Sequence, residues 1–220
     1  MPNPAIIKQL YESRINQYAA FVGFFHSRGG IKALLERSGL LQPRMKVLDA
    51  GCGFGMATFA LLDALDARNM PPVHVDAFDL TPAMLQRFRS ELDTRKLSLI
   101  RLQEADILDD NALPENWTSY DFVVSTSMLE YLPRDQLPHA LSTLRMRMKP
   151  GSRMLVVITR KSLVTKVLIE WAWKAERYTA DELRAAFSQA GFDQLEFIRF
   201  PLRYGWLNQS NHVVVAQRSE

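Results

Sequence analysis

The sequence predicts an α/β fold with a doubly wound, mostly parallel sheet and helices on both faces. Short runs of strand-forming residues alternate with longer segments whose apolar residues recur at helical spacing. Three glycines at alternate positions follow the first strand and lead directly into a helix. Because ligands of such sheets bind at the carboxyl ends of the strands, this glycine turn marks the expected site.

The composition fits one globular domain. The chain has 220 residues, of which 47% are hydrophobic and 23% charged, enough for a sheet covered on both faces. A net charge of +3, spread along the chain, does not indicate a nucleic-acid partner. The single cysteine, Cys52, excludes an internal disulfide and cysteine-rich zinc sites, and no acids and histidines have metal-ligand spacing. Without a transmembrane run or a signal-peptide pattern, we expect a cytoplasmic protein.

Two helices are predicted before the first strand. Apolar residues recur at helical spacing over residues 4–26, and Ser27-Arg28-Gly29-Gly30 interrupts the pattern. A second helix ends near Gly39, and Gln42-Pro43 forms a linker. We therefore expect residues 1–42 to form an N-terminal helical cap.

Turn and capping signals separate the later elements. Pro71-Pro72 ends the helix after the glycine turn, and Lys149-Pro150-Gly151 turns into the fifth strand. Thr81 and Thr179 are predicted N-caps, with Gly191 just past the end of the last helix. The predicted strands span about 47–48, 73–79, 97–102, 121–125, 154–158, 195–200 and 213–216; the predicted helices span about 56–68, 82–95, 135–148, 162–176 and 180–190.

The glycine turn, Gly51 to Gly55, predicts a binding site for a nucleotide-like ligand. Glycine permits positive φ and removes Cβ atoms that would keep a ligand from the main chain. The dinucleotide fingerprint requires a third glycine where Met56 stands, so that pattern fails. Asp49, two residues before the first glycine, is unfavourable for an anionic pyrophosphate and suits a ligand with positive charge.

The stretch Val47-Leu48-Asp49-Ala50-Gly51-Cys52-Gly53-Phe54-Gly55 resembles the first motif of class I S-adenosylmethionine-dependent methyltransferases. The resemblance covers nearly all of the chain after residue 43 and implies a Rossmann-like seven-stranded sheet. Its last strand, near 212–216, would run antiparallel between strands five and six. Segments similar to later motifs of the family follow in order: Phe78-Asp79-Leu80-Thr81-Pro82, Glu104-Ala105-Asp106-Ile107, 120–125, 128–133, and 178–183 with 190–192.

The resemblance implies S-adenosyl-L-methionine as cofactor. Asp79 would bind both ribose hydroxyls, since one carboxylate accepts two hydrogen bonds from a diol. Asp106 would face the adenine amino group, and Asp49 would either approach the methionine amino group or only cap the turn. Tyr18 would reach the cofactor carboxylate unless its helix merely packs on the domain. The expected cofactor-binding residues are Asp49, Gly51, Gly53, Gly55, Asp79, Leu80, Asp106, Ile107, Ser125 and Tyr18.

No residue is a clear catalytic base. The candidates are Tyr131 and Glu130 after the fourth strand, and His26 after the first helix. Many relatives carry histidine at the Tyr131 position, so histidine-driven deprotonation there is in doubt. Methyl transfer from a sulfonium needs no covalent intermediate, so we expect Cys52 to be structural. Ser125-Thr126-Ser127-Met128 replaces the Asn/Asp-Pro-Pro-Tyr motif of enzymes that methylate DNA bases or glutamine, which argues against those acceptors.

The predicted helix 162–176 is more apolar than a helix that only covers a sheet. We expect residues 161–178 to form a lid over the acceptor, between a cofactor-binding core at 43–160 and a C-terminal helix and β-hairpin at 179–220. Deeper burial, a dimer interface and contact of 162–176 with a membrane surface are alternatives.

Together these features predict methyl transfer to a small, hydrophobic or amphipathic acceptor, such as a lipid-like molecule or secondary metabolite, by a monomer or homodimer. The enzyme would contribute mainly alignment and exclusion of water. The alternatives are a protein or RNA methyltransferase and a non-catalytic cofactor-binding partner subunit. Whether O, N or C is methylated stays open.

Overall fold

The computed structural model describes residues 28–162 and 175–219. The predictions for the helix at 4–26, with Tyr18 and His26, and for most of the lid helix at 162–176 therefore concern residues outside the described part. None of the described helices is long and apolar enough to cross a membrane.

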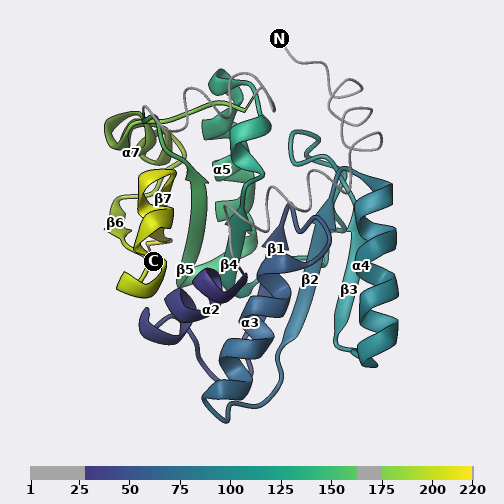
Figure 1. Ribbon diagram of the computed structural model, residues 1–220. Coiled ribbons are helices and arrows are strands. Elements are labelled where there is room, and N and C mark those ends of the chain that lie inside the picture. The colour runs from purple at the N-terminus through teal and green to yellow at the C-terminus, as the bar shows by residue number, and fades with distance from the viewer. Residues whose placement is uncertain (1–27, 163–174, 220) are drawn as a thin grey trace.

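The core is a seven-stranded sheet with the order β3-β2-β1-β4-β5-β7-β6 (Figure 1). The first five strands are mutually parallel, and β7 runs antiparallel to both β5 and β6, as predicted. The strands are β1 Lys46–Ala50, β2 His74–Asp79, β3 Ile100–Glu104, β4 Tyr120–Thr126, β5 Met148–Thr159, β6 Gln194–Ile198 and β7 Asn211–Gln217.

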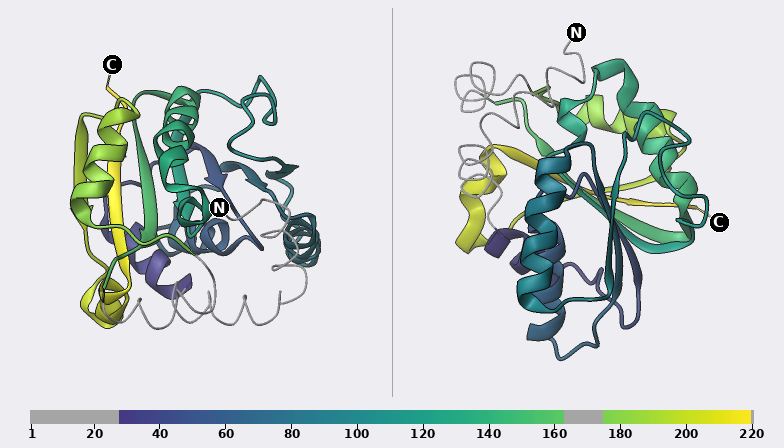
Figure 2. Two further views of the ribbon diagram at one scale, coloured as in Figure 1. Left: turned by 90° about the horizontal axis from the view of Figure 1, so that it is seen from above. Right: turned by 90° about the vertical axis from the view of Figure 1, so that its right-hand side faces the viewer.

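Helices cover both faces of this sheet (Figure 2). On one face α2 (Arg28–Arg37), α3 (Met56–Ala67) and α4 (Pro82–Arg95) pack on one apolar cluster. On the other, α5 (Leu137–Arg147) and α7 (Ala180–Gln189) pack on a second. Successive strand residues face opposite sides, so Val47 joins the first cluster and Leu48 the second.

The predicted starts of β3 and β5 were wrong. Residues 97–99 do not begin β3, because Lys96 takes a left-handed φ of 54° and the Leu97 N–H bonds to the Leu92 carbonyl, which closes α4. The predicted turn at Lys149-Pro150-Gly151 lies inside β5, which starts at Met148. Gly151 has a φ of 76°, and the pairing of β4 with β5 shifts register nearby. The turn signal therefore marks a strand irregularity.

Helix starts were predicted more closely. Thr179 and Glu182 form a capping box at α7, with the Glu182 N–H donating to Thr179 Oγ1 at 3.2 Å. The helix predicted at 135–148 begins later, at Leu137, because two short 3-10 segments precede it. These are η1 (Leu129–Tyr131) and η2 (Arg134–Gln136); a third, η3 (Leu202–Gln209), joins β6 to β7.

Candidate functional site

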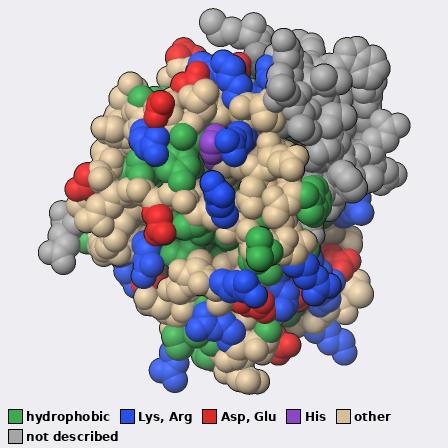
Figure 3. Space-filling model, turned by 60° about the vertical axis from the view of Figure 1, so that its left-hand side comes forward, with side chains coloured by type: hydrophobic (Ala, Val, Ile, Leu, Met, Phe, Trp, Pro, Cys, Tyr) green, Lys and Arg blue, Asp and Glu red, His purple; other side chains and the backbone are tan. Residues whose placement is uncertain are grey.

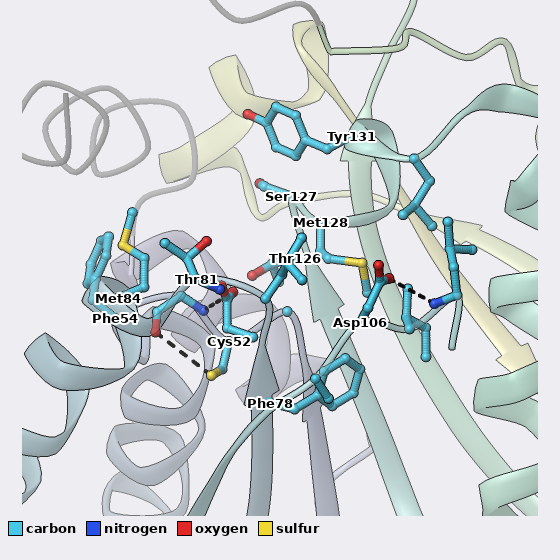
Figure 4. Close-up of a pocket in the computed structure, with 18 of the residues that line it drawn as sticks. Cys52, Phe54, Phe78, Thr81, Met84, Asp106, Thr126, Ser127, Met128 and Tyr131 are labelled. Carbon is cyan, nitrogen blue, oxygen red and sulfur yellow. Dashed lines mark hydrogen bonds between the residues drawn. The ribbon is translucent and has the colours of Figure 1, made fainter. Parts of the chain in front are cut away.

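A pocket opens at the carboxyl ends of β1, β2, β3 and β4 (Figure 4). It encloses about 1090 Å³, counted out to its open mouth. The glycine turn, the residues after β2 and β3, and the segment that leads from β4 into η1 form its walls. The lining residues are Gly51, Cys52, Gly53, Phe54, Met56, Phe78, Asp79, Leu80, Thr81, Met84, Ala105, Asp106, Ile107, Leu108, Thr126, Ser127, Met128, Tyr131, Leu132 and Pro133.

The three glycines of the turn are required for different reasons, although all have positive φ. A Cβ on Gly51 would lie 2.2 Å from Met128 Cβ, and one on Gly55 would lie 2.2 Å from the Phe88 ring. These two positions are therefore fixed by protein packing. A Cβ on Gly53 would meet no atom within 4 Å, so Gly53 alone faces open space that a ligand can enter.

Asp79 joins the end of β2 to the glycine turn. Its Oδ2 accepts a hydrogen bond from the Gly53 N–H at 2.9 Å, and its Oδ1 accepts one from the Thr81 N–H at 2.8 Å. Burial raises the pKa of this carboxyl group, and the two backbone N–H groups oppose the rise. An ionised carboxylate retains further acceptor capacity after these two bonds, and Asp79 lines the pocket.

Asp49 lies behind the turn and does not line the pocket. Its Oδ2 accepts hydrogen bonds from the Thr58 N–H at 3.1 Å and the Thr58 hydroxyl at 2.6 Å, which ties β1 to the first turn of α3. Its Oδ1 is buried without a hydrogen-bond partner. Burial raises the pKa of Asp49 to about 7. A positive charge near the turn would stabilise its ionised form.

Asp106 lines the pocket at the end of β3. Its Oδ1 accepts a hydrogen bond from the Leu108 N–H at 2.9 Å, which fixes the turn that follows. Ile107, Leu80 and Phe78 also line the pocket, and Ile107 and Phe78 belong to one apolar cluster. This end of the pocket therefore combines a carboxylate with apolar walls.

The segment after β4 forms the opposite wall. Tyr131 lines the pocket, close to Ser127 in Figure 4. Glu130 points away from the lining and is 1% exposed, with its Oε1 accepting a hydrogen bond from the Thr159 hydroxyl at 3.1 Å. Burial raises the pKa of Glu130 to about 7. Ser125 is buried behind the wall.

The structure thus brings seven of the predicted site residues to one pocket: Gly51, Gly53, Asp79, Leu80, Asp106, Ile107 and Tyr131. It places Asp49, Gly55, Ser125 and Glu130 behind the lining. Three apolar lining residues were not predicted there: Phe54 within the glycine turn, and Met84 and Met128 from other segments. Within the described ranges, no group of three or more His, Cys, Asp or Glu side chains could hold a metal ion.

Residues 47–151 match the model of a family described as "Methyltransferase domain". The chain is also 28% identical, over 151 residues, to a malonyl-[acyl-carrier protein] O-methyltransferase of Paenibacillus sp. strain JDR-2, covering 66% of this chain and 52% of that protein. The chain is therefore similar to class I S-adenosylmethionine-dependent methyltransferases.

Other similar proteins carry different names. The chain is 24% identical to a carboxy-S-adenosyl-L-methionine synthase of Stutzerimonas stutzeri, covering 76% of this chain and 65% of that one. It thus spans about half to two thirds of the length of these two relatives. The structure of magnesium protoporphyrin IX methyltransferase from Synechocystis PCC 6803 with bound SAH superposes with a TM-score of 0.73 and 17% identity, over 99% of this chain and all of that one.

The site fits S-adenosyl-L-methionine, the cofactor of the methyltransferases that the chain resembles. The open space at Gly53 admits a ligand against the turn backbone. The unpartnered, buried Asp49 Oδ1 suits a ligand with positive charge, and the pocket-lining charges of the described residues, Asp79 and Asp106, are both negative. A sulfonium cofactor that carries an amino group matches this charge pattern.

Proposed function

We propose that this chain transfers a methyl group from S-adenosyl-L-methionine to a small acceptor with an apolar or amphipathic body. The observation that carries the proposal is the single pocket that joins two kinds of wall. Its glycine-turn side presents Asp79 and the open face of Gly53. Its β4 side presents the side chains of Tyr131, Leu132 and Pro133, together with the hydroxyl residues Thr126 and Ser127.

In this proposal each carboxylate has its own role. Asp79 accepts hydrogen bonds from the ribose hydroxyls, while its bonds to Gly53 and Thr81 hold it in place. Asp106 faces the adenine amino group, with Leu80 and Ile107 against the ring. Asp49 acts from behind the turn on the amino group of the cofactor.

The bound cofactor supplies an activated methyl group on a sulfonium. The protein aligns the acceptor with that methyl group and excludes water from the pocket. Tyr131 orients the acceptor from the η1 wall. Cys52, which is buried and whose thiol has a pKa raised well above its usual value by burial, takes no part in the transfer.

Two kinds of observation support a small acceptor. One similar structure is that of an enzyme named for a small molecule, magnesium protoporphyrin IX. On the face drawn in Figure 3, Lys and Arg side chains are interspersed with Asp and Glu and form no continuous basic surface. A protein or RNA methyltransferase would be expected to display a denser basic patch or a recognition domain.

The test has two stages. Calorimetry should first show binding of S-adenosylmethionine and S-adenosylhomocysteine to the purified chain; no binding of either contradicts the proposal. The chain is then incubated with a cell extract and a cofactor labelled in its methyl group. Label in the small-molecule fraction supports the proposal, label in protein or RNA supports the alternative, and binding without transfer supports a non-catalytic subunit.

A further inference from the structure

Glu130 lies directly behind the pocket wall on the β4 side. It belongs to η1, between Met128 and Tyr131, which both line the pocket. Its carboxyl group contacts the end of β5 through Thr159, and its backbone carbonyl accepts a hydrogen bond from the Glu176 N–H at 2.7 Å. The carboxyl group therefore lies where η1, the end of β5 and residues 175–178 meet.

Among the described residues, two buried polar atoms at this junction have no hydrogen-bond partner. They are Glu130 Oε2 and the hydroxyl oxygen of Tyr178, and each residue is 1% exposed. Burial chiefly raises the pKa of the Tyr178 hydroxyl, Arg134 opposes the rise, and the charges of Glu176 and Glu130 add to it. Glu130 and Tyr178 are thus within electrostatic reach of each other.

An unpartnered buried polar group destabilises the folded protein. Most buried polar groups in native proteins are therefore paired, and those that are not often indicate a ligand, an ion or a water. The ionised Glu130 carboxylate can only accept hydrogen bonds, and the Tyr178 hydroxyl can donate or accept, so a ligand that donates to Glu130 could satisfy both groups.

The cation that contacts the Tyr178 ring is already paired with other acids. Arg134 lies over the Tyr178 ring at 4.6 Å, but its guanidinium already pairs with Glu176 and Glu182, each at 3.0 Å. No ion pair among the described residues involves Glu130. Of the pocket-lining residues that the structure describes, none is Lys, Arg or His. An ionised Glu130 would repel a carboxylate or phosphate on the acceptor. An ammonium would stabilise the ionised form, whose pKa burial raises to about 7 in the ligand-free protein, and would supply hydrogen-bond donors.

We propose that Glu130, assisted by Tyr178, determines acceptor specificity and that the acceptor is an amine whose ammonium group binds the Glu130 carboxylate. This inference rests on the proposed methyltransferase function and names the acceptor class. Because η1 separates the carboxyl group from the pocket, binding requires the side chain of Tyr131 or the η1 turn to move aside. A neutral hydroxyl would supply a donor without the charge and binds less tightly.

Three probes with the same apolar body test the proposal: phenethylamine, 2-phenylethanol and phenylacetate. Their binding to the full chain is measured by calorimetry with S-adenosylhomocysteine at saturation. We expect phenethylamine to bind at least about tenfold more tightly than the other two. Equal affinity for the three, a preference for phenylacetate, or no binding of phenethylamine at about 10 mM overturns the proposal.

Variants assign the preference to the carboxylate. E130Q keeps the size of the side chain and an oxygen that can accept from Thr159, and it should lose the roughly tenfold preference while the affinity for S-adenosylhomocysteine changes less than about twofold. E176Q, at an exposed acid of the same junction, should retain the preference. An E130Q protein that still prefers phenethylamine overturns the proposal. If E130Q does not fold, the same comparison is made with Y178F, which should have a weaker preference for phenethylamine than the unmodified chain. An unchanged preference in Y178F then overturns the proposal. Failure of the unmodified chain to bind S-adenosylhomocysteine would instead refute the methyltransferase function.

Discussion

The carboxylate of Asp79 accepts a hydrogen bond from the Gly53 N–H at 2.9 Å, so the end of β2 holds the glycine turn that follows β1. Its other oxygen accepts from the Thr81 N–H at the start of α4. One side chain therefore fixes two of the pocket walls and is also proposed to bind the ribose. Removal of the Asp79 carboxylate should therefore lower the cofactor affinity and also loosen the glycine turn and the start of α4.

Asp79→Asn should weaken S-adenosylhomocysteine binding by at least about tenfold, or about 1.4 kcal/mol. The reason is geometric, because both carboxylate oxygens face backbone N–H groups and the asparagine NH2 must oppose one of them. Calorimetry measures the loss. Asp106→Asn is the matched control, since its amide oxygen can keep the single bond to the Leu108 N–H. We expect a smaller loss there, and equal losses would contradict the dual role of Asp79.

Alanine substitutions should distinguish the glycine that faces the ligand from the two glycines that are fixed by protein packing. Gly53→Ala leaves room for the new Cβ, and the left-handed φ of 53° costs about 1–2 kcal/mol. The methyl group would occupy ligand space, so S-adenosylhomocysteine affinity should fall while the protein stays folded. Gly51→Ala and Gly55→Ala should lower the melting temperature far more, because each Cβ would lie 2.2 Å from a neighbouring side chain. Similar melting temperatures for all three variants would refute this distinction.

The sequence was sufficient to predict the order of strands and helices, because periodicity and turn residues are local signals. It also placed Asp79 and Asp106 in one site, since parallel strands present their carboxyl ends at one edge. It could not predict that Gly51 and Gly55 are fixed by Met128 and Phe88, because those contacts depend on segments far apart in the chain. The burial of Glu130 and Asp49, and the pKa shifts that follow, likewise depend on three-dimensional packing.

The stability of the ligand-free protein should fall as pH rises through neutrality. Burial raises the pKa of Asp49 from 3.8 to about 7 and that of Glu130 from 4.5 to about 7. The folded state therefore holds protons that the unfolded state releases, and this contribution is complete below the unfolded values and is lost as pH passes through about 7.

Asp49→Asn removes one of these charges and should flatten the dependence. Urea unfolding at about pH 5 and about pH 8.5 measures it, and we expect the variant to lose about 1–3 kcal/mol less than the unmodified chain between the two. Asp63→Asn is the control, at a half-exposed acid paired with Arg28. If the unfolding free energy of Asp49→Asn depends on pH as strongly as that of the unmodified chain, Asp49 does not have a raised pKa in the folded state.

A buried network at the other end of the sheet should contribute to stability alone. Asp76 in β2 is fully buried and accepts hydrogen bonds from Tyr120 at 2.7 Å and from Arg101 at 2.6 and 2.9 Å. Burial alone would raise its pKa, but the bonds from Arg101 and Tyr120 lower it below its usual value. Asp76 does not line the pocket.

Tyr120→Phe should therefore cost about 1–2 kcal/mol of unfolding free energy and leave S-adenosylhomocysteine affinity within about twofold. The loss arises because the Asp76 carboxylate keeps Arg101 but loses one buried donor. Arg95→Gln breaks an exposed i,i+4 pair with Glu91 and is the control, with an expected cost of about 0.5 kcal/mol or less. Urea unfolding and calorimetry on the same samples decide. A Tyr120→Phe variant that binds the ligand weakly at full stability would show that this network reaches the pocket.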